Sequence, residues 1–288
     1  MRAMKVPFRL VDVFAERPMA GNQLCVITDP GTLDTAGMQE IAREIGFSET
    51  TFVTSIGDSA YSMRIFTPGG ELPFAGHPTL GTAYVLVSEG LLTSPAIQSV
   101  GAGDFVVTVD VERRFAGVQQ HAPEFGPEIE DITTVTEAAG LSKKDIHPAL
   151  RPRVVSTGLP HLMVPAASVS AVEHAQPDQR ALTHLLQEVG ADGYYLFALT
   201  DEGAKARLFA PDLGIMEDPA TGSAAGPLAA YLAERGAHTE PLMIRQGEEI
   251  GRPSVLHAHA ERVGRVWEVT VGGSVWVVGE GAFDLDPG

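Results

Sequence analysis

A pattern that occurs twice constrains the fold of this 288-residue chain more than any other feature. The segment RIFTP begins at Arg64, and the similar segment RLFAP begins 143 residues later, at Arg207. Further along, Gly76-His77 and Gly222-Ser223, which are 146 residues apart, each precede a stretch of apolar residues. Self-similarity of this kind is a sign of repeated architecture. It favours a duplicated chain with two similar halves that face each other. The alternative is a chance likeness of two strand-loop-helix units.

Strand-like and helix-like segments alternate along the chain, without the strict rhythm of a doubly wound fold. Residues 9–28 contain two β-rich runs around a turn of Pro, Gly and Asn, which predicts a pair of strands. Residues 33–47 have helical spacing of apolar residues, with Asp34 as the expected N-cap and Gly46 as the expected stop. Residues 79–90 predict an apolar helix, which must be buried.

The charge of the chain excludes some classes of partner. Lys and Arg total 20 and Asp and Glu total 37, which gives a formal net charge of −17. Because phosphate contacts are made by clustered Lys and Arg, we expect no nucleic-acid partner. The hydrophobic fraction of 44% is enough for a real core. An acidic protein repels anions at long range, so a small anionic ligand would need a locally positive pocket.

A single cysteine, Cys25, excludes an intramolecular disulfide and any site built on a cysteine pair. His257 and His259 lie two apart, but without nearby cysteines and with Ala258 and Ala260 beside them we expect no metal. The first residues lack the apolar run of a signal peptide, and no stretch is long and apolar enough to span a membrane. We therefore expect a cytoplasmic protein with no membrane partner.

The repeat also suggests how an acidic chain could bind an anion. Gly76-His77 and Gly222-Ser223 each lie where an apolar helix is expected to begin. The N-terminus of a helix carries N–H groups without helical partners and about half a positive charge. If the halves face each other, two such ends can form one site for a carboxylate without lysines. The alternative for each glycine is an ordinary turn.

Four segments then point to a family. GFSETTFV, RIFTPGGELPFAGHPTLGTA, EDPATGSAAGPLA and QGEEIGRPS closely resemble the PhzF family of phenazine-biosynthesis-like isomerases, in family order and over essentially the whole chain. The resemblance implies an α+β fold of the diaminopimelate epimerase-like type. Such a fold has two similar halves, each with a mostly antiparallel sheet around a central helix, and an active site in the cleft between them. It also implies a homodimer and no cofactor.

The resemblance assigns roles to residues in these segments. It implies that Glu49 is the general acid/base, that His77 orients Glu49 or donates to substrate, and that Asp218 contacts the amino or hydroxyl group of the substrate. The alternatives are a surface glutamate, a histidine bonded to a helix start and a capping carboxylate. Gly76, Gly222 and Ser223 would bind the substrate carboxylate, and Ser223 has simple helix capping as its alternative.

One departure from the related epimerases is informative. Those enzymes racemise a carbon with two cysteines, at positions that fall here near Ala75 and near residues 218–219. Neither position holds a cysteine, and Cys25 lies in another segment, where we expect it to pack in a strand as a small apolar residue. A two-thiol racemase is therefore excluded, whereas one carboxylate that moves a proton on one face of a substrate fits.

The sequence thus predicts a cofactor-independent isomerase that moves a proton on a small cyclic carboxylic acid, as in the isomerisation of trans-2,3-dihydro-3-hydroxyanthranilate in the resembled family. The alternatives are a small-carboxylate binding protein and another isomerase or lyase on the same scaffold. The repeat places one half at residues 1–117, with 278–288 returning to it, and the other at residues 118–277.

Overall fold

The computed structural model describes residues 4–285, which form two compact units. Unit 1 contains the described residues up to Gln119 and those from Gly272 onward, and unit 2 is formed by Gln120–Val271. The chain therefore returns from unit 2 to unit 1 between Val271 and Gly272, six residues before the boundary at 277/278 that the sequence suggested. The reason is that one strand, β17 (Val266–Leu285), runs through the crossing without a turn.

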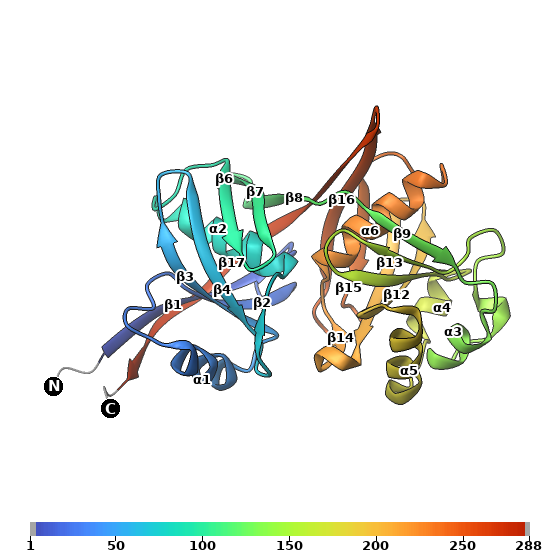
Figure 1. Ribbon diagram of the computed structural model, residues 1–288, viewed down its shortest axis with the longest axis horizontal. Coiled ribbons are helices and arrows are strands. Elements are labelled where there is room, and N and C mark those ends of the chain that lie inside the picture. The colour runs from blue at the N-terminus through green and yellow to red at the C-terminus, as the bar shows by residue number, and fades with distance from the viewer. Residues whose placement is uncertain (1–3, 286–288) are drawn as a thin grey trace. The chain divides into compact units, whose positions relative to one another are not determined.

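In unit 1 one helix lies among the strands and another covers them from outside (Figure 1). The elements are β1 (Met4–Val13), β2 (Asn22–Ile27), α1 (Thr35–Ile45), β3 (Glu49–Ile56), β4 (Ala60–Phe66), β5 (Glu71–Leu72), α2 (Gly76–Ser88), β6 (Ala96–Val100), β7 (Gly103–Asp110), β8 (Phe115–Gln120) and part of β17. β17 pairs with both β1 and β8, so the strands close into a ring. The apolar helix α2 contacts β1, β2, β3 and β7. Every residue of this helix from Gly76 to Leu86 is buried.

Helix α1 shows how local sequence positions the first predicted site residue. The Asp34 side chain accepts a hydrogen bond from the Gly37 N–H, and Gly46 ends the helix at a φ of 67°. This left-handed conformation favours glycine. The chain then enters β3, whose first residue is Glu49. The predicted helix, its cap and its stop are confirmed, as is the antiparallel pair of β1 and β2.

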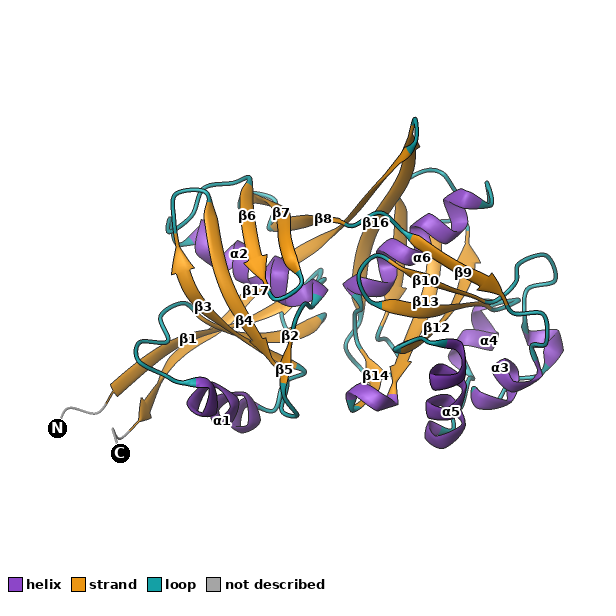
Figure 2. Ribbon diagram, in the orientation of Figure 1, coloured by secondary structure: helices purple, strands orange, loops and turns teal. Residues whose placement is uncertain are grey.

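Unit 2 repeats this plan, with three helices, α3, α4 and α5, outside its strands (Figure 2). The elements are β9 (Glu124–Glu128), α3 (Thr133–Ala138), a 3-10 turn (Lys143–Asp145), β10 (Arg153–Ser156), β11 (Pro160–Pro165), α4 (Val169–Glu173), α5 (Gln179–Val189), β12 (Gly193–Thr200), β13 (Gly203–Ala210), a second 3-10 turn (Pro211–Leu213), β14 (Ile215–Asp218), α6 (Gly222–Glu234), β15 (Leu242–Gln246) and β16 (Ser254–Val263). The apolar helix α6 contacts β10, β11 and β16, so the sheet curves around it.

Strand pairing shows that the two units share one topology. In unit 1 the pairs β1–β2, β2–β3, β3–β4, β4–β6 and β6–β7 are alternately antiparallel and parallel. The pairs β10–β11, β11–β12, β12–β13, β13–β15 and β15–β16 alternate in the same order. Helices α2 and α6 both span 13 residues. The expectation of an α+β fold with two similar halves, each a mostly antiparallel sheet around a central helix, is confirmed.

Candidate functional site

Glu49 is a buried carboxyl group at the start of β3. It lies opposite Leu24 of β2 in the parallel pair, and only 6% of its surface is exposed. Burial disfavours the charged form, and it raises the pKa of Glu49 from 4.5 to about 7, although a hydrogen bond from the Ser48 side chain acts in the opposite direction. A group with a pKa near the working pH can both take and return a proton. The surface-glutamate alternative is therefore wrong.

His77 approaches Glu49 from the second position of α2. Its Nε2 atom lies 3.4 Å from Oε2 of Glu49, and both side chains are more than nine-tenths buried. This separation exceeds an ordinary hydrogen bond, but it is short enough for each group to affect the charge of the other. The structure thus brings together two of the residues to which the sequence assigned chemistry.

The central helices α2 and α6 both begin without a hydrogen bond from the side chain of the N-cap residue. The N-cap residues are Ala75 for α2 and Thr221 for α6, and neither side chain bonds to the first turn. The first residue of each helix is a buried glycine, Gly76 or Gly222. The first N–H groups of a helix have no partner within that helix and carry its partial positive charge. Each unit therefore has one helix end with the chemistry of an anion site.

Asp218 is the last residue of β14, and it is 6% exposed. The Thr221 hydroxyl donates a hydrogen bond to its Oδ2 atom. The N-cap position of α6 is Thr221, three residues after Asp218. Ser223 is the second residue of the helix, and its Oγ atom lies 3.0 Å from Nε2 of His161.

Sequence reasoning missed Gln246, which holds the segment around Asp218. Gln246 is completely buried, and its Nε2 donates to the Asp218 carbonyl oxygen at 2.8 Å and to Oγ1 of Thr221 at 3.0 Å. Its Oε1 accepts a hydrogen bond from the Tyr195 hydroxyl at 3.1 Å. Thr221 can therefore use its own hydrogen toward the Asp218 carboxylate. The only sequence signal for Gln246 is that it begins the segment QGEEIGRPS.

His161 was also missed. It comes from β11, in the segment STGLPHLMV, where nothing in the spacing of residues distinguishes it from a core histidine. The described residues contain no group of three or more His, Cys, Asp or Glu side chains that could hold a metal ion. Within residues 4–285 no helix is long and apolar enough to cross a membrane.

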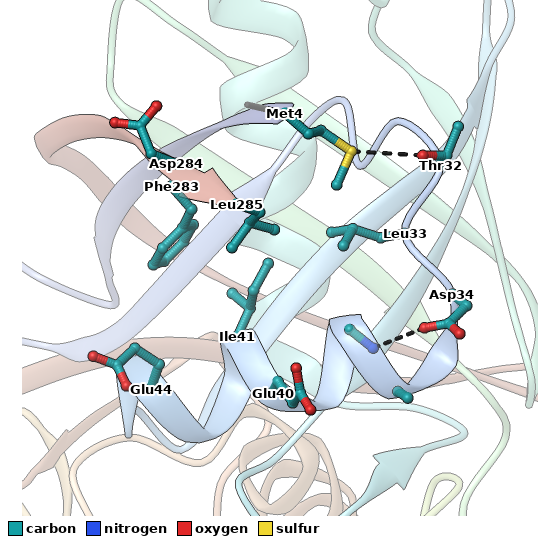
Figure 3. Close-up of a pocket in the computed structure, with 12 residues that line it drawn as sticks. Met4, Thr32, Leu33, Asp34, Glu40, Ile41, Glu44, Phe283, Asp284 and Leu285 are labelled. Carbon is teal, nitrogen blue, oxygen red and sulfur yellow. Dashed lines mark hydrogen bonds between the residues drawn. The ribbon is translucent and has the colours of Figure 1, made fainter. Parts of the chain in front are cut away.

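A pocket of unit 1 contains none of the predicted site residues (Figure 3). It has a volume of about 720 Å³ and lies beside α1 and the end of β17. Apolar side chains such as Ile41 and Leu285 and carboxylates such as Glu40 and Glu44 line it. Carboxylates at the rim repel an anionic ligand, so this pocket does not have the chemistry of the predicted site.

Comparisons with known proteins identify the family of the chain. The family model PhzC-PhzF, described as phenazine biosynthesis-like protein, matches residues 11–281. The trans-2,3-dihydro-3-hydroxyanthranilate isomerase of Pseudomonas chlororaphis is 36% identical over 287 residues, which cover 96% of this chain and 98% of that protein.

Solved structures show the same fold. A Bacillus anthracis phenazine biosynthesis protein of the PhzF family superimposes with a TM-score of 0.88 at 27% identity, covering 97% of this chain and 99% of that one. A probable proline racemase from Agrobacterium radiobacter K84 gives a TM-score of 0.66 at 12% identity, covering 98% and 94%. The second likeness extends the fold to the epimerase-like proteins.

Proposed function

This chain belongs to the PhzC-PhzF family of phenazine biosynthesis-like proteins and is an isomerase, and on that premise we propose that it moves a proton on a small cyclic carboxylic acid. The proposed substrate is trans-2,3-dihydro-3-hydroxyanthranilate, the compound named for the Pseudomonas chlororaphis relative. The observation that carries the proposal is the buried Glu49, whose pKa is raised to about 7.

The reaction needs one group that acts first as a base and then as an acid. Ionised Glu49 takes an allylic proton, and the electron pair of the broken C–H bond enters the conjugated system of the substrate. Protonated Glu49 then returns the proton to another carbon of the same face, so a new C–H bond forms. Substrate and product are isomers, and no electrons are gained or lost. His77, 3.4 Å away, orients the Glu49 carboxyl group for both steps.

The remaining predicted residues bind the substrate in this proposal. The N–H groups of Gly76, Gly222 and Ser223, together with the Ser223 hydroxyl, bind the substrate carboxylate, because each lies at the start of an uncapped helix. Asp218 accepts a hydrogen bond from the amino or hydroxyl group of the substrate. The homodimer and the cytoplasmic location implied by the family resemblance are part of the same proposal.

Proton NMR in D2O tests the proposal. Wild-type protein should convert dihydro-hydroxyanthranilate and bring deuterium into the product, because Glu49 exchanges its proton with solvent. Glu49→Gln has nearly the same shape but cannot carry the proton, so we expect turnover to fall by about 100-fold or more. The matched control is Glu40→Gln on the exposed face of α1, which should retain wild-type activity.

Two results would contradict the proposal. Wild-type turnover in Glu49→Gln would remove Glu49 from the chemistry. Saturable binding by the wild-type protein without conversion or deuterium exchange would identify a carboxylate-binding protein instead of an isomerase of this substrate.

A further inference from the structure

Unit 2 contains a side-chain pair, His161 and Ser223. It lies between a parallel strand pair and a central helix that are equivalent to those carrying Glu49 and His77 in unit 1. In the parallel pair β2–β3, Leu24 lies opposite Glu49, and in the equivalent pair β11–β12, His161 lies opposite Gly193. Gly193 and Glu49 are each the first residue of their strand. The equivalent of the acid-bearing position is therefore a glycine.

The helices complete the equivalence. His77 and Ser223 are both the second residue of a 13-residue central helix. In unit 1 the helix residue meets a side chain from the second strand of the parallel pair, Glu49. In unit 2 it meets a side chain from the first strand, His161, with 3.0 Å between Nε2 and Oγ of Ser223.

His161 explains why residue 193 is a glycine. A Cβ atom at this position would lie 2.6 Å from Nδ1 of His161 and 3.2 Å from its Cε1. Contacts under about 3 Å are far inside van der Waals separation. No side chain fits at position 193 while the His161 ring is in place, so unit 2 cannot carry a second acid there.

The surroundings of His161 determine which ring nitrogen holds the hydrogen. The residue is 1% exposed, and burial lowers its pKa to about 3, so the ring is neutral. Among the described residues Nδ1 has no hydrogen-bond partner. An α-hydrogen of Gly193 points at Nδ1 of His161. If Nδ1 carried the ring hydrogen, that hydrogen would clash with the α-hydrogen of Gly193. If Nδ1 carries no hydrogen, it accepts a weak C–H contact from Gly193.

We propose that His161 is a positioning residue whose Nε2–H donates to the Ser223 hydroxyl oxygen, so that Ser223 must direct its own hydrogen to an anionic oxygen of the ligand. Ser223 is partly exposed, so its hydroxyl can reach a ligand. In this arrangement His161 does not take a proton from Ser223, and Ser223 is a donor rather than a nucleophile. That the ligand oxygen belongs to the substrate carboxylate rests on the proposed function; the tautomer does not.

Nitrogen-15 NMR of the histidine rings tests the tautomer without any substrate. We expect His161 to remain in the Nε2–H form from about pH 5 to 8. In Ser223→Ala the Nε2 hydrogen loses its acceptor, and its exchange with solvent should accelerate by about tenfold or more. An Nδ1–H tautomer in the wild type would overturn the proposal, because Ser223 would then donate to the ring.

Kinetics test the consequence for binding. His161→Leu should raise KM by about tenfold with little change in kcat, because a hydrogen bond to the carboxylate acts equally on bound substrate and transition state. His161→Gln keeps a donor near the Nε2 position and should recover part of the loss. In a Ser223→Ala background His161→Leu should add no more than about twofold. A full further loss there would show that His161 does not act through Ser223.

Gly193→Ala is a second variant that leaves both side chains present. The added methyl group displaces the His161 ring, so it should reproduce the KM increase, whereas Gly70→Ala, with open space around it, should not. Melting temperatures identify variants that fail to fold. If the wild-type protein does not convert the substrate, the proposed function fails on its own, and the ring tautomer still decides this proposal.

Discussion

Glu49 owes its chemical character to burial rather than to its neighbours in the sequence. A glutamate at the start of a strand is ordinarily a solvated residue, and the segment GFSETTFV contains no other charge. In the fold Glu49 is 6% exposed, and desolvation is the largest cause of its raised pKa. The helix stop at Gly46 and the parallel register with Leu24 place it there.

The hydrogen bond from Ser48 gives a prediction about pH dependence. This bond favours the carboxylate and lowers the pKa of Glu49, which burial raises to about 7. The acid side of the kcat/KM profile should therefore have its midpoint near 7 in the wild type, and Ser48→Ala should move it to higher pH. The check is the pH profile of isomerisation, with Ser55→Ala on the exposed part of β3 as the control. An unchanged midpoint in Ser48→Ala would contradict the assignment of that limb to Glu49.

The same group affects stability. The folded-state pKa of Glu49, about 7, lies above its ordinary value of 4.5, so its contribution is fully present below 4.5 and is lost as pH rises through 7. Glutamine at this position does not titrate. Relative to Glu49→Gln, the wild type should therefore lose up to about 3 kcal/mol of unfolding free energy between about pH 4.5 and 8. Urea denaturation of both proteins across this range measures the difference, which should not be constant with pH.

Equivalent helices of the two units begin and end at the same kinds of residue. Helices α1 and α5 each span 11 residues, begin after an aspartate whose side chain caps the first turn, and end at a left-handed glycine. These signals are local, and the sequence revealed them for α1. Side-chain contacts between elements far apart in the sequence differ more between the two units. The ion pairs made by Arg64 and Arg207, the arginines of RIFTP and RLFAP, are an example.

Arg64 and Arg207 give a matched test of burial. Arg64 pairs with Glu71, and both side chains are partly exposed, at 30% and 41%. Arg207 pairs with Glu217 at 8% and 12%, and it also donates to carbonyl oxygens of Val172 and Ala175 at the end of α4.

We therefore expect unequal costs from the same substitution. Arg207→Met should destabilise the protein by about 3–5 kcal/mol, because it leaves a buried carboxylate and the carbonyl groups of Val172, Glu173 and Ala175 without this donor. Arg64→Met should cost about 1 kcal/mol or less, because water replaces the lost contacts. Chemical denaturation of the two variants decides the matter, and equal losses would contradict this account of the repeat.

At the scale of the molecule, the strand order shows the repeat more fully than the sequence does. Only short segments such as RIFTP and RLFAP are alike, yet five successive strand pairs have the same order of directions in each unit. Topology depends on hydrogen bonds of the backbone, which many side chains can support. The residues at one pair of equivalent positions differ, with Glu49 in one unit and Gly193 in the other.

The homodimer remains a prediction from the family resemblance. Sedimentation velocity should give a species of twice the 30.5 kDa of one chain, and its proportion should decrease on dilution if the interface is weak. A single species of 30.5 kDa at all concentrations would contradict the prediction and leave the isomerase proposal untouched.

The sequence by itself determined the features that depend on neighbours along the chain or on recurrent segments. These are the repeat, the cap and stop of α1, and the exclusion of a two-thiol mechanism. Through the family resemblance the sequence also predicts the roles of Glu49, His77, Asp218 and the helix-start residues. Only the tertiary structure decided the raised pKa of Glu49, the support of Asp218 by Gln246 and the pairing of His161 with Ser223. Burial and contacts between strands far apart in the chain are properties of the packed molecule, and no local pattern of residues encodes them.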